Sequence, residues 1–158
     1  MLTRSFRLTG VLCSLLSGAM LLVAPSARAG AKEDVAAAAA KWATSFVDDN
    51  PDSILAMYDD EAVLWGTLSS TRLAGKQAVR GYFEMAFKVV PGHKVAFGDQ
   101  LIRVYGDIAI NTGYYTISYV KDGEAKSLPA RYSFVYRKRD GTWLIVDHHS
   151  SAMPTPAR

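Results

Sequence analysis

The chain has 158 residues, of which 49% are hydrophobic, with 18 Lys and Arg against 15 Asp and Glu and a single cysteine. This length suits one domain, and one cysteine excludes an intramolecular disulfide and a multi-thiolate metal site. Arg4, Arg7 and Arg28 account for the basic excess, so the rest of the chain gives no indication of nucleic-acid binding.

The first residues follow the pattern of an export signal. Arg4 and Arg7 precede an apolar run at 8–23, and the sequence Ala27-Arg28-Ala29 follows it. A charged start, an apolar centre and small residues around the cleavage point predict removal near Ala29-Gly30. The mature protein would then be secreted or periplasmic, without stable membrane association. An uncleaved membrane anchor is the alternative, but the run is short for a span.

We therefore expect residues 1–29 to be a signal peptide and residues 30–158 to form a single domain. Its first half predicts helices. Alanine-rich residues 33–47 predict the first, which Asp48 to Pro51 terminate. The remaining expected elements are a short helix capped by Asp52 or Ser53 and ending near Tyr58, a strand at 62–70, a short strand near 72–73, a turn at Gly75 and a helix at 76–89.

The second half predicts strands. Residues 93–151 are rich in Val, Ile, Tyr, Phe and Thr, and the turn dipeptides Gly106-Asp107, Asp122-Gly123 and Asp140-Gly141 divide them. Four consecutive antiparallel strands are expected. Helices followed by such a meander predict an α+β domain in which the helices cover one face of a curved sheet.

Strict alternation from Asp140-Gly141 sets the expected register of the last strand. One set would face inward: Trp143, Ile145, Asp147, His149 and Ser151. The other set would face outward: Leu144, Val146, His148 and Ser150. Both faces begin with apolar residues, so we expect a second subunit to cover the outer face at Leu144 and Val146.

Several segments resemble a known superfamily. They are "LWGTLS", "GKQAVRGYF" and "ARYSFVYRKRDGTWLIVDHHSSAMP". The chain resembles the cone-shaped nuclear transport factor 2-like proteins, which pack a curved antiparallel sheet against N-terminal helices. Within that superfamily it is similar to bacterial relatives of the calcium/calmodulin-dependent protein kinase II association (hub) domain, also labelled SgcJ/EcaC-type proteins.

The resemblance implies a pocket between helices and sheet, and oligomers formed through the outer sheet face. It implies neither kinase activity nor calmodulin binding. The hub carries pocket arginines on its last two strands, and alignment from Asp140-Gly141 places Phe134 and Ser150 at those positions. Arg131 is a candidate replacement for one of these arginines, with a small organic acid as the possible ligand.

Three functional hypotheses follow. The first is a ligand pocket that binds a small organic molecule through Arg131, His149 and Ser151, with Tyr114, Tyr82 and Trp65 as further candidate ligand-binding residues. The second is a pocket enzyme of the isomerase, dehydratase or polyketide-cyclase type with Asp147 or His149 as general base. In the alternative structural interpretation, Asp147 pairs with Arg131 as a buried ion pair. The third hypothesis is a purely structural assembly module.

Metal and nucleophilic chemistry are not favoured. His148 and His149 are neighbours on a strand and should point to opposite faces, whereas zinc needs three or four converging ligands. A Gly-x-Ser-x-Gly motif is absent from the sequence, and residues two apart on a strand do not form a catalytic triad. We expect no metal and no cofactor.

Overall fold

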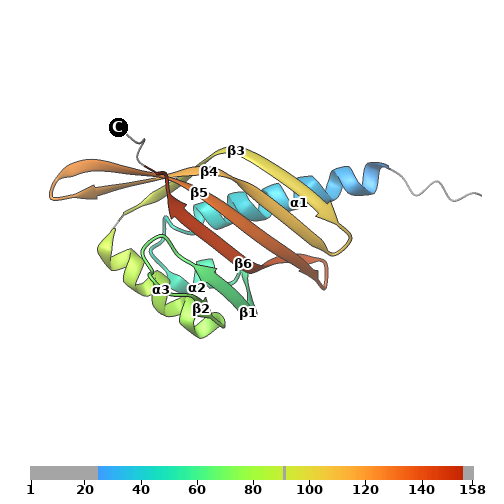
Figure 1. Cartoon of the computed structure of the whole chain (residues 1–158), viewed down its shortest axis with the longest axis horizontal. Helices are drawn as coiled ribbons and strands as arrows, with labels where there is room; N and C mark the ends of the chain where they lie inside the picture. The colour runs from blue at the N-terminus through green and yellow to red at the C-terminus, as the bar shows by residue number, and fades with distance from the viewer. Residues whose placement is uncertain (1–24, 91, 155–158) are drawn as a thin grey trace, which may run out of the picture.

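The protein is described by a computed structural model over residues 25–90 and 92–154 (Figure 1). Within these residues, three helices and six strands follow one another along the chain. The elements are α1 (Pro25–Thr44), α2 (Pro51–Leu55), β1 (Tyr58–Trp65), β2 (Leu73–Ala74), α3 (Lys76–Val89), β3 (Lys94–Tyr105), β4 (Ile108–Lys121), β5 (Glu124–Arg139) and β6 (Thr142–Ala152).

The six strands form one sheet in the order β2-β1-β6-β5-β4-β3. The expected meander of β3 to β6 is antiparallel throughout, and β1 joins it as a parallel neighbour of β6. Asp122-Gly123 and Asp140-Gly141 both have positive φ angles, which suits the tight two-residue turns of twisted hairpins. The predicted α+β class with a curved sheet is confirmed.

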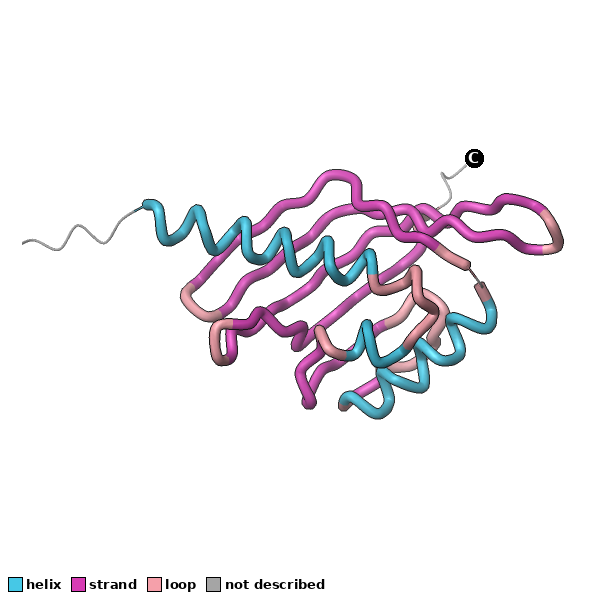
Figure 2. Tube along the Cα trace, turned by 180° about the vertical axis from the view of Figure 1, so that it is seen from behind, coloured by secondary structure: helices cyan, strands magenta, loops and turns pink. Residues whose placement is uncertain are grey.

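All three helices contribute to one side of the sheet. Figure 2 shows α1 lying across the sheet, while α2 and α3 lie together near β1. The core fills the space between the helices and the sheet. Its largest members from the helices are Trp42 of α1 and Phe83 and Phe87 of α3. None of the helices in the described residues is long and apolar enough to cross a membrane.

Element ends in the first half differ from the sequence predictions. Helix α1 ends at Thr44 rather than residue 47, and its first residue, Pro25, precedes the expected cleavage point. The apolar run of the expected signal lies outside the described residues. Asn50 caps α2, because its side chain accepts a hydrogen bond from the Asp52 N–H at 2.9 Å. Strand β1 begins at Tyr58 because that residue pairs with Ile145 of β6, a contact distant in sequence.

Strand β6 contains a β-bulge that local alternation does not predict. Ile145 pairs with Tyr136 of β5, and Asp147 pairs with the next residue, Val135, so Val146 is an extra residue. Side chains after the bulge therefore change faces. Trp143 and Ile145 face the core as expected, but beyond the bulge the core-facing residues are His148 and Ser150.

The predicted inward placement of Asp147, His149 and Ser151 is therefore wrong, as is the outward placement of His148 and Ser150. The physical reason is the additional residue of the bulge. The prediction that His148 and His149 point to opposite faces is confirmed, since His148 is buried and His149 is exposed.

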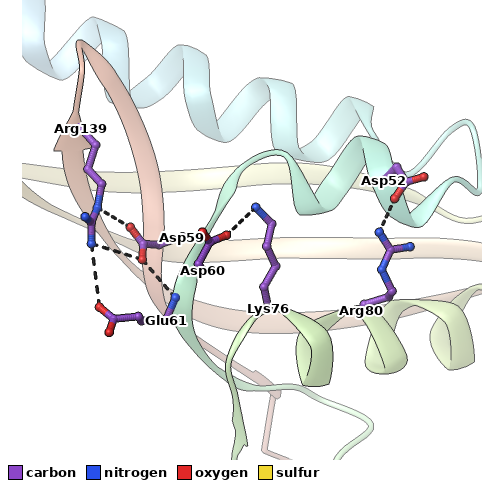
Figure 3. A network of polar contacts seen from close by, with 7 residues as sticks. All are labelled: Asp52, Asp59, Asp60, Glu61, Lys76, Arg80 and Arg139. Atoms are coloured by element: carbon purple, nitrogen blue, oxygen red, sulfur yellow. Dashed lines mark hydrogen bonds and ion pairs between the residues drawn. The ribbon is translucent and has the colours of Figure 1, made fainter.

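An ion-pair network joins elements at the β1 edge of the sheet (Figure 3). Arg139, at the end of β5, contacts Asp59 of β1 with Nε and Oδ2 2.6 Å apart, and the Asp59 side chain is only 4% exposed. Asp59 Oδ1 also accepts a hydrogen bond from the Glu61 N–H at 3.1 Å. Lys76 of α3 pairs with Asp60 at 3.1 Å. These contacts fix the β5–β6 hairpin and the start of α3 to β1.

Candidate functional site

A cavity of about 50 Å³ lies between the helices and the inner face of the sheet. Its innermost wall consists of buried, mainly aromatic residues: Trp42, Phe46, Phe83, Ala86, His93, Tyr115, His148 and Ser150. More accessible side chains complete it and mark its mouth: Leu68, Val90, Tyr119 and Leu128. The bulge in β6 is what brings His148 and Ser150 to this cavity.

A chain of buried hydrogen bonds sets the orientation of His148. Trp42 Nε1, which can only donate, contacts the Tyr58 hydroxyl oxygen at 3.1 Å. The Tyr58 hydroxyl lies 2.8 Å from His148 Nδ1. Because its oxygen accepts from Trp42, the Tyr58 hydroxyl satisfies its own hydrogen by donating to Nδ1. Burial raises the pKa of Tyr58 and keeps this donor protonated.

This arrangement leaves the proton of a neutral His148 on Nε2. The residue is 2% exposed, and its Nε2 has no hydrogen-bond partner among the described residues. Complete burial lowers the pKa of His148 to about 3, and the neighbouring His149 adds to this effect, so the ring is neutral at physiological pH. A buried donor without an acceptor costs about 1–3 kcal/mol. The His148 side chain lines the cavity, whereas Tyr58 does not, and Nε2 is the ring nitrogen that Tyr58 leaves unpaired.

A hydroxyl cluster stands beside His148 in the same cavity. Tyr115 donates to Ser150 Oγ at 2.5 Å, and Thr67 Oγ1 also contacts Ser150 Oγ. Tyr115 also has a side-chain hydrogen bond with Thr67, so the three hydroxyls contact one another. Ser150 is two residues from His148 on one strand face, at a typical Cα separation of about 6.5–7 Å.

Tyr82 is the residue among the predicted ligand-binding set that does line the cavity. Its hydroxyl accepts a weak hydrogen bond from the Leu68 N–H at 3.5 Å, and burial raises its pKa. Gly66 makes this position possible, since a Cβ atom there would lie 2.3 Å from the Tyr82 ring. The sequence "LWGTLS" carries this glycine, but its packing role depends on a contact with α3.

The other predicted ligand-binding residues lie on the outer face of the sheet. Arg131 donates from Nε to Ser151 Oγ at 3.1 Å, and it pairs laterally with Tyr114, which is 53% exposed. Trp65 is 46% exposed and lies beside His149 through the β1–β6 pairing. These five residues therefore lie on the opposite side of the sheet from the cavity. Arg131, Ser151 and Tyr114 form one group, and Trp65 and His149 form another.

The proposed general bases also lie outside the cavity. Asp147 is half-buried on the outer face, where partial burial raises its pKa and the nearby His149 opposes the shift. Asp147 lies beside Val63 and Val135 in the sheet. Within the described part of the chain, no ion pair joins it to Arg131. Neither Asp147 nor His149 is placed to act on a molecule in the cavity.

Charged side chains do not contribute to the described lining of the cavity. The lining contains no Lys, Arg, Asp or Glu. Its two histidines are His93 and His148. Burial lowers the pKa of His93 as well, although a backbone hydrogen bond with Val90 and the charge of Asp49 oppose the shift. The described residues also contain no group of three or more His, Cys, Asp and Glu that could hold a metal ion.

His148 and Ser150 are the site residues that strand alternation missed. A signal for them was nevertheless present in the sequence. Alignment with the hub domain places Phe134 and Ser150 at pocket positions, and the structure puts both on the inner face. Because His148 lies two residues before Ser150, it shares that face.

The fold defines the class of protein, and solved structures agree with it. A nuclear transport factor 2-like protein from Pseudomonas putida KT2440 superposes with a TM-score of 0.69 at 19% identity, covering 79% of this chain and 88% of the other. One from Novosphingobium aromaticivorans, with a cystatin-like fold, gives a TM-score of 0.71 at 14% identity over 89% and 95% of the two chains. The domain therefore has the nuclear transport factor 2-like fold.

A closer relationship comes from the sequence. Residues 31–154 match the model of the calcium/calmodulin-dependent protein kinase II association domain. A crystal structure from Xanthomonas campestris described by that family name is 38% identical, with a TM-score of 0.70 over 76% of this chain and 86% of the other. The chain belongs to the calcium/calmodulin-dependent protein kinase II association domain family. No curated protein matches the sequence.

Proposed function

We propose that this protein is an exported, self-associating domain that holds a small organic molecule in the cavity between its helices and its sheet. The observation that carries the proposal is a buried histidine, His148, that lines the cavity and whose Nε2 donor has no partner among the described residues. A bound molecule with an acceptor atom would satisfy this donor. The aromatic lining would supply most of the contact surface.

Family membership supports the self-association part of the proposal. The outer face of the sheet offers a mixed apolar surface for a second copy. Half-buried Val63, Ile110 and Val135 lie at its centre in one lateral row, with Asp147 between the two valines, and the exposed ring of Trp65 lies at its edge. Association domains are named for assembly, and an apolar sheet face of this kind is suited to it.

Native mass spectrometry of the chain purified from the exported fraction tests the proposal. We expect an N-terminus near Gly30, an oligomeric mass and a discrete additional mass that is released on denaturation. A Ser150→Ala variant should lose the additional mass, because the hydroxyl cluster would be broken. Ser151→Ala is the matched control, since Ser151 lies on the outer face, and it should keep the mass. A monomer without any additional mass would contradict the proposal.

A further inference from the structure

The hydrogen-bond donors in the cavity restrict the chemistry of its ligand. We infer that the cavity selects an uncharged molecule with a carbonyl-type oxygen, which accepts hydrogen bonds from His148 Nε2–H and from one hydroxyl of the Thr67, Tyr115 and Ser150 cluster. This inference rests on the proposed function, because it names the ligand class of the same cavity. Ketones, esters, amides and quinones are the compounds that fit this description.

The need for an acceptor follows from counting hydrogens. The hydrogen bonds from Trp42 to Tyr58 and from Tyr58 to His148 Nδ1 leave Nε2–H without an acceptor. The three hydroxyls of the cluster contact one another, and a ligand oxygen can take over one of these internal contacts. A carbonyl oxygen has two lone pairs and can accept from both donors, whereas an amine or a hydrocarbon cannot.

The absence of charge among the described lining residues excludes an ionic ligand. A carboxylate would be buried without a cation, since the lining supplies two neutral imidazoles and no Lys or Arg. An ammonium group would equally lack a carboxylate partner. Burial of an unpaired ion is far less favourable than burial of a hydrogen-bonded neutral group. An uncharged ligand differs from the small organic acid that the hub resemblance implies.

The size of the cavity suits the carbonyl end of a larger molecule. Its volume of about 50 Å³ accommodates a small polar group. A ring attached to that group would extend toward the mouth, between Leu68, Tyr119 and Leu128. The aromatic side chains of Trp42 and Tyr82 would flank it, and aromatic surfaces favour offset or edge contacts with a planar ligand.

Three matched probes test the inference by fluorine NMR titration of the mature protein. 4-Fluoroacetophenone carries a carbonyl group, 4-fluoroethylbenzene replaces that group by a methylene, and 4-fluorobenzoate replaces it by a carboxylate. We expect saturable binding of the ketone, at least tenfold tighter than that of either analogue at pH 7, because only the ketone supplies a neutral acceptor.

A histidine pair provides the matched variants. His148→Asn keeps an acceptor near the Nδ1 position for Tyr58 but removes the Nε2 donor, so ketone affinity should fall at least fivefold. His149→Asn alters the outer face and should leave the affinity unchanged. If His148→Asn does not fold, Ser150→Ala against Ser151→Ala gives the same comparison through the hydroxyl cluster.

The possible results separate the inference from the proposed function. Equal or tighter binding of the benzoate or the ethylbenzene would overturn the inference, while still showing the cavity to be a ligand site. Failure of the ketone to bind up to its solubility limit would also overturn it. If in addition no probe binds and no mass is retained in native mass spectrometry, the proposed function fails as well.

Discussion

The direction of each hydrogen bond around His148 decides what the cavity can bind. Trp42 donates to Tyr58, Tyr58 donates to Nδ1, and the proton on Nε2 has no acceptor among the described residues. The ring also packs between aromatic neighbours, with its centroid 4.4 Å from that of Phe134 and 5.4 Å from that of Trp42. A residue held in this way is a fixed neutral donor, and it is poorly suited to act as a base near neutral pH.

This burial predicts a specific loss of stability in acid. The folded-state pKa of His148 is about 3, below the ordinary value of 6.5, so between these values the unfolded chain binds a proton that the folded chain does not. The contribution of His148 to the free energy of unfolding is fully present above about pH 6.5. It is lost as the pH falls, at up to about 1.4 kcal/mol per pH unit. Burial also lowers the pKa of His93, so this residue adds to the loss of stability in acid.

Urea unfolding of wild type and His148→Asn between pH 7 and pH 4.5 measures this effect. The variant should show a shallower decline of the free energy of unfolding, because one of the buried imidazoles is gone. Ser150→Ala, which removes no titratable group, should keep the wild-type slope. Identical slopes for His148→Asn and wild type would show that His148 is not buried in its neutral form.

At the scale of secondary-structure elements, the bulge at Val146 determines which face of β6 reaches the cavity. Deletion of Val146 would restore strict alternation and move either Trp143 and Ile145 or His148 and Ser150 out of the core. In the first case, exposure of two large apolar side chains costs about 1.5–3 kcal/mol each. In the second case, the hydrogen bond between Tyr58 and His148 is lost and a cavity is left in the core. We therefore expect the deletion to destabilise the fold by about 3 kcal/mol or more in urea unfolding.

Val146→Ala is the control for the deletion, because it shortens the side chain but keeps the extra residue. We expect it to cost less than about 1.5 kcal/mol, since Val146 is half-buried and only two methyl groups are lost. A deletion variant as stable as Val146→Ala would argue against the bulge.

The ion pair between Asp59 of β1 and Arg139 of β5 can be compared with the exposed pair between Asp60 and Lys76 (Figure 3). Asp59→Asn weakens the buried pair with Arg139 and should cost about 1–2 kcal/mol in thermal or urea unfolding. Asp60→Asn is matched in chemistry, but the Asp60 side chain is 89% exposed and its pair with Lys76 should contribute under about 1 kcal/mol. Equal losses for the two variants would contradict the assigned role of Asp59.

These elements also show how far the sequence alone leads. Helix α3 has the bounds predicted for it, and the Asp-Gly turns divide the strands as expected, because caps and turns depend on neighbouring residues. The start of β1 and the bulge in β6 depend on pairing between distant strands. Local alternation cannot detect an extra residue, so it placed His149 and Ser151 on the wrong face. Alignment with the hub preserves spatial position and placed Ser150 correctly.

At the scale of the whole molecule, the two faces of the sheet have separate roles in this account. The inner face forms the cavity, and the outer face is proposed to bind a second copy. Val135→Lys places a charge at the centre of the outer face, beside Asp147, where a monomer tolerates it. We expect light scattering to show a smaller assembly than wild type, with binding of 4-fluoroacetophenone unchanged.

Val120→Lys is the control for the outer face. Val120 is an exposed valine, whereas Val135 is half-buried, and Val120 lies near the tip of the hairpin between β4 and β5, which projects beyond the rest of the sheet (Figure 1). This variant should assemble like wild type. A Val135→Lys protein with the wild-type mass would exclude this region of the sheet as the interface.

Nitrogen-15 NMR of the imidazole rings determines whether His148 is neutral and carries its proton on Nε2. With the resonances assigned through His148→Asn, we predict a protonated Nε2 and an unprotonated Nδ1 for His148, unchanged from pH 8 to pH 5, with the Nε2–H signal shifted on addition of 4-fluoroacetophenone. A proton on Nδ1, or titration of this ring within that range, would contradict the account.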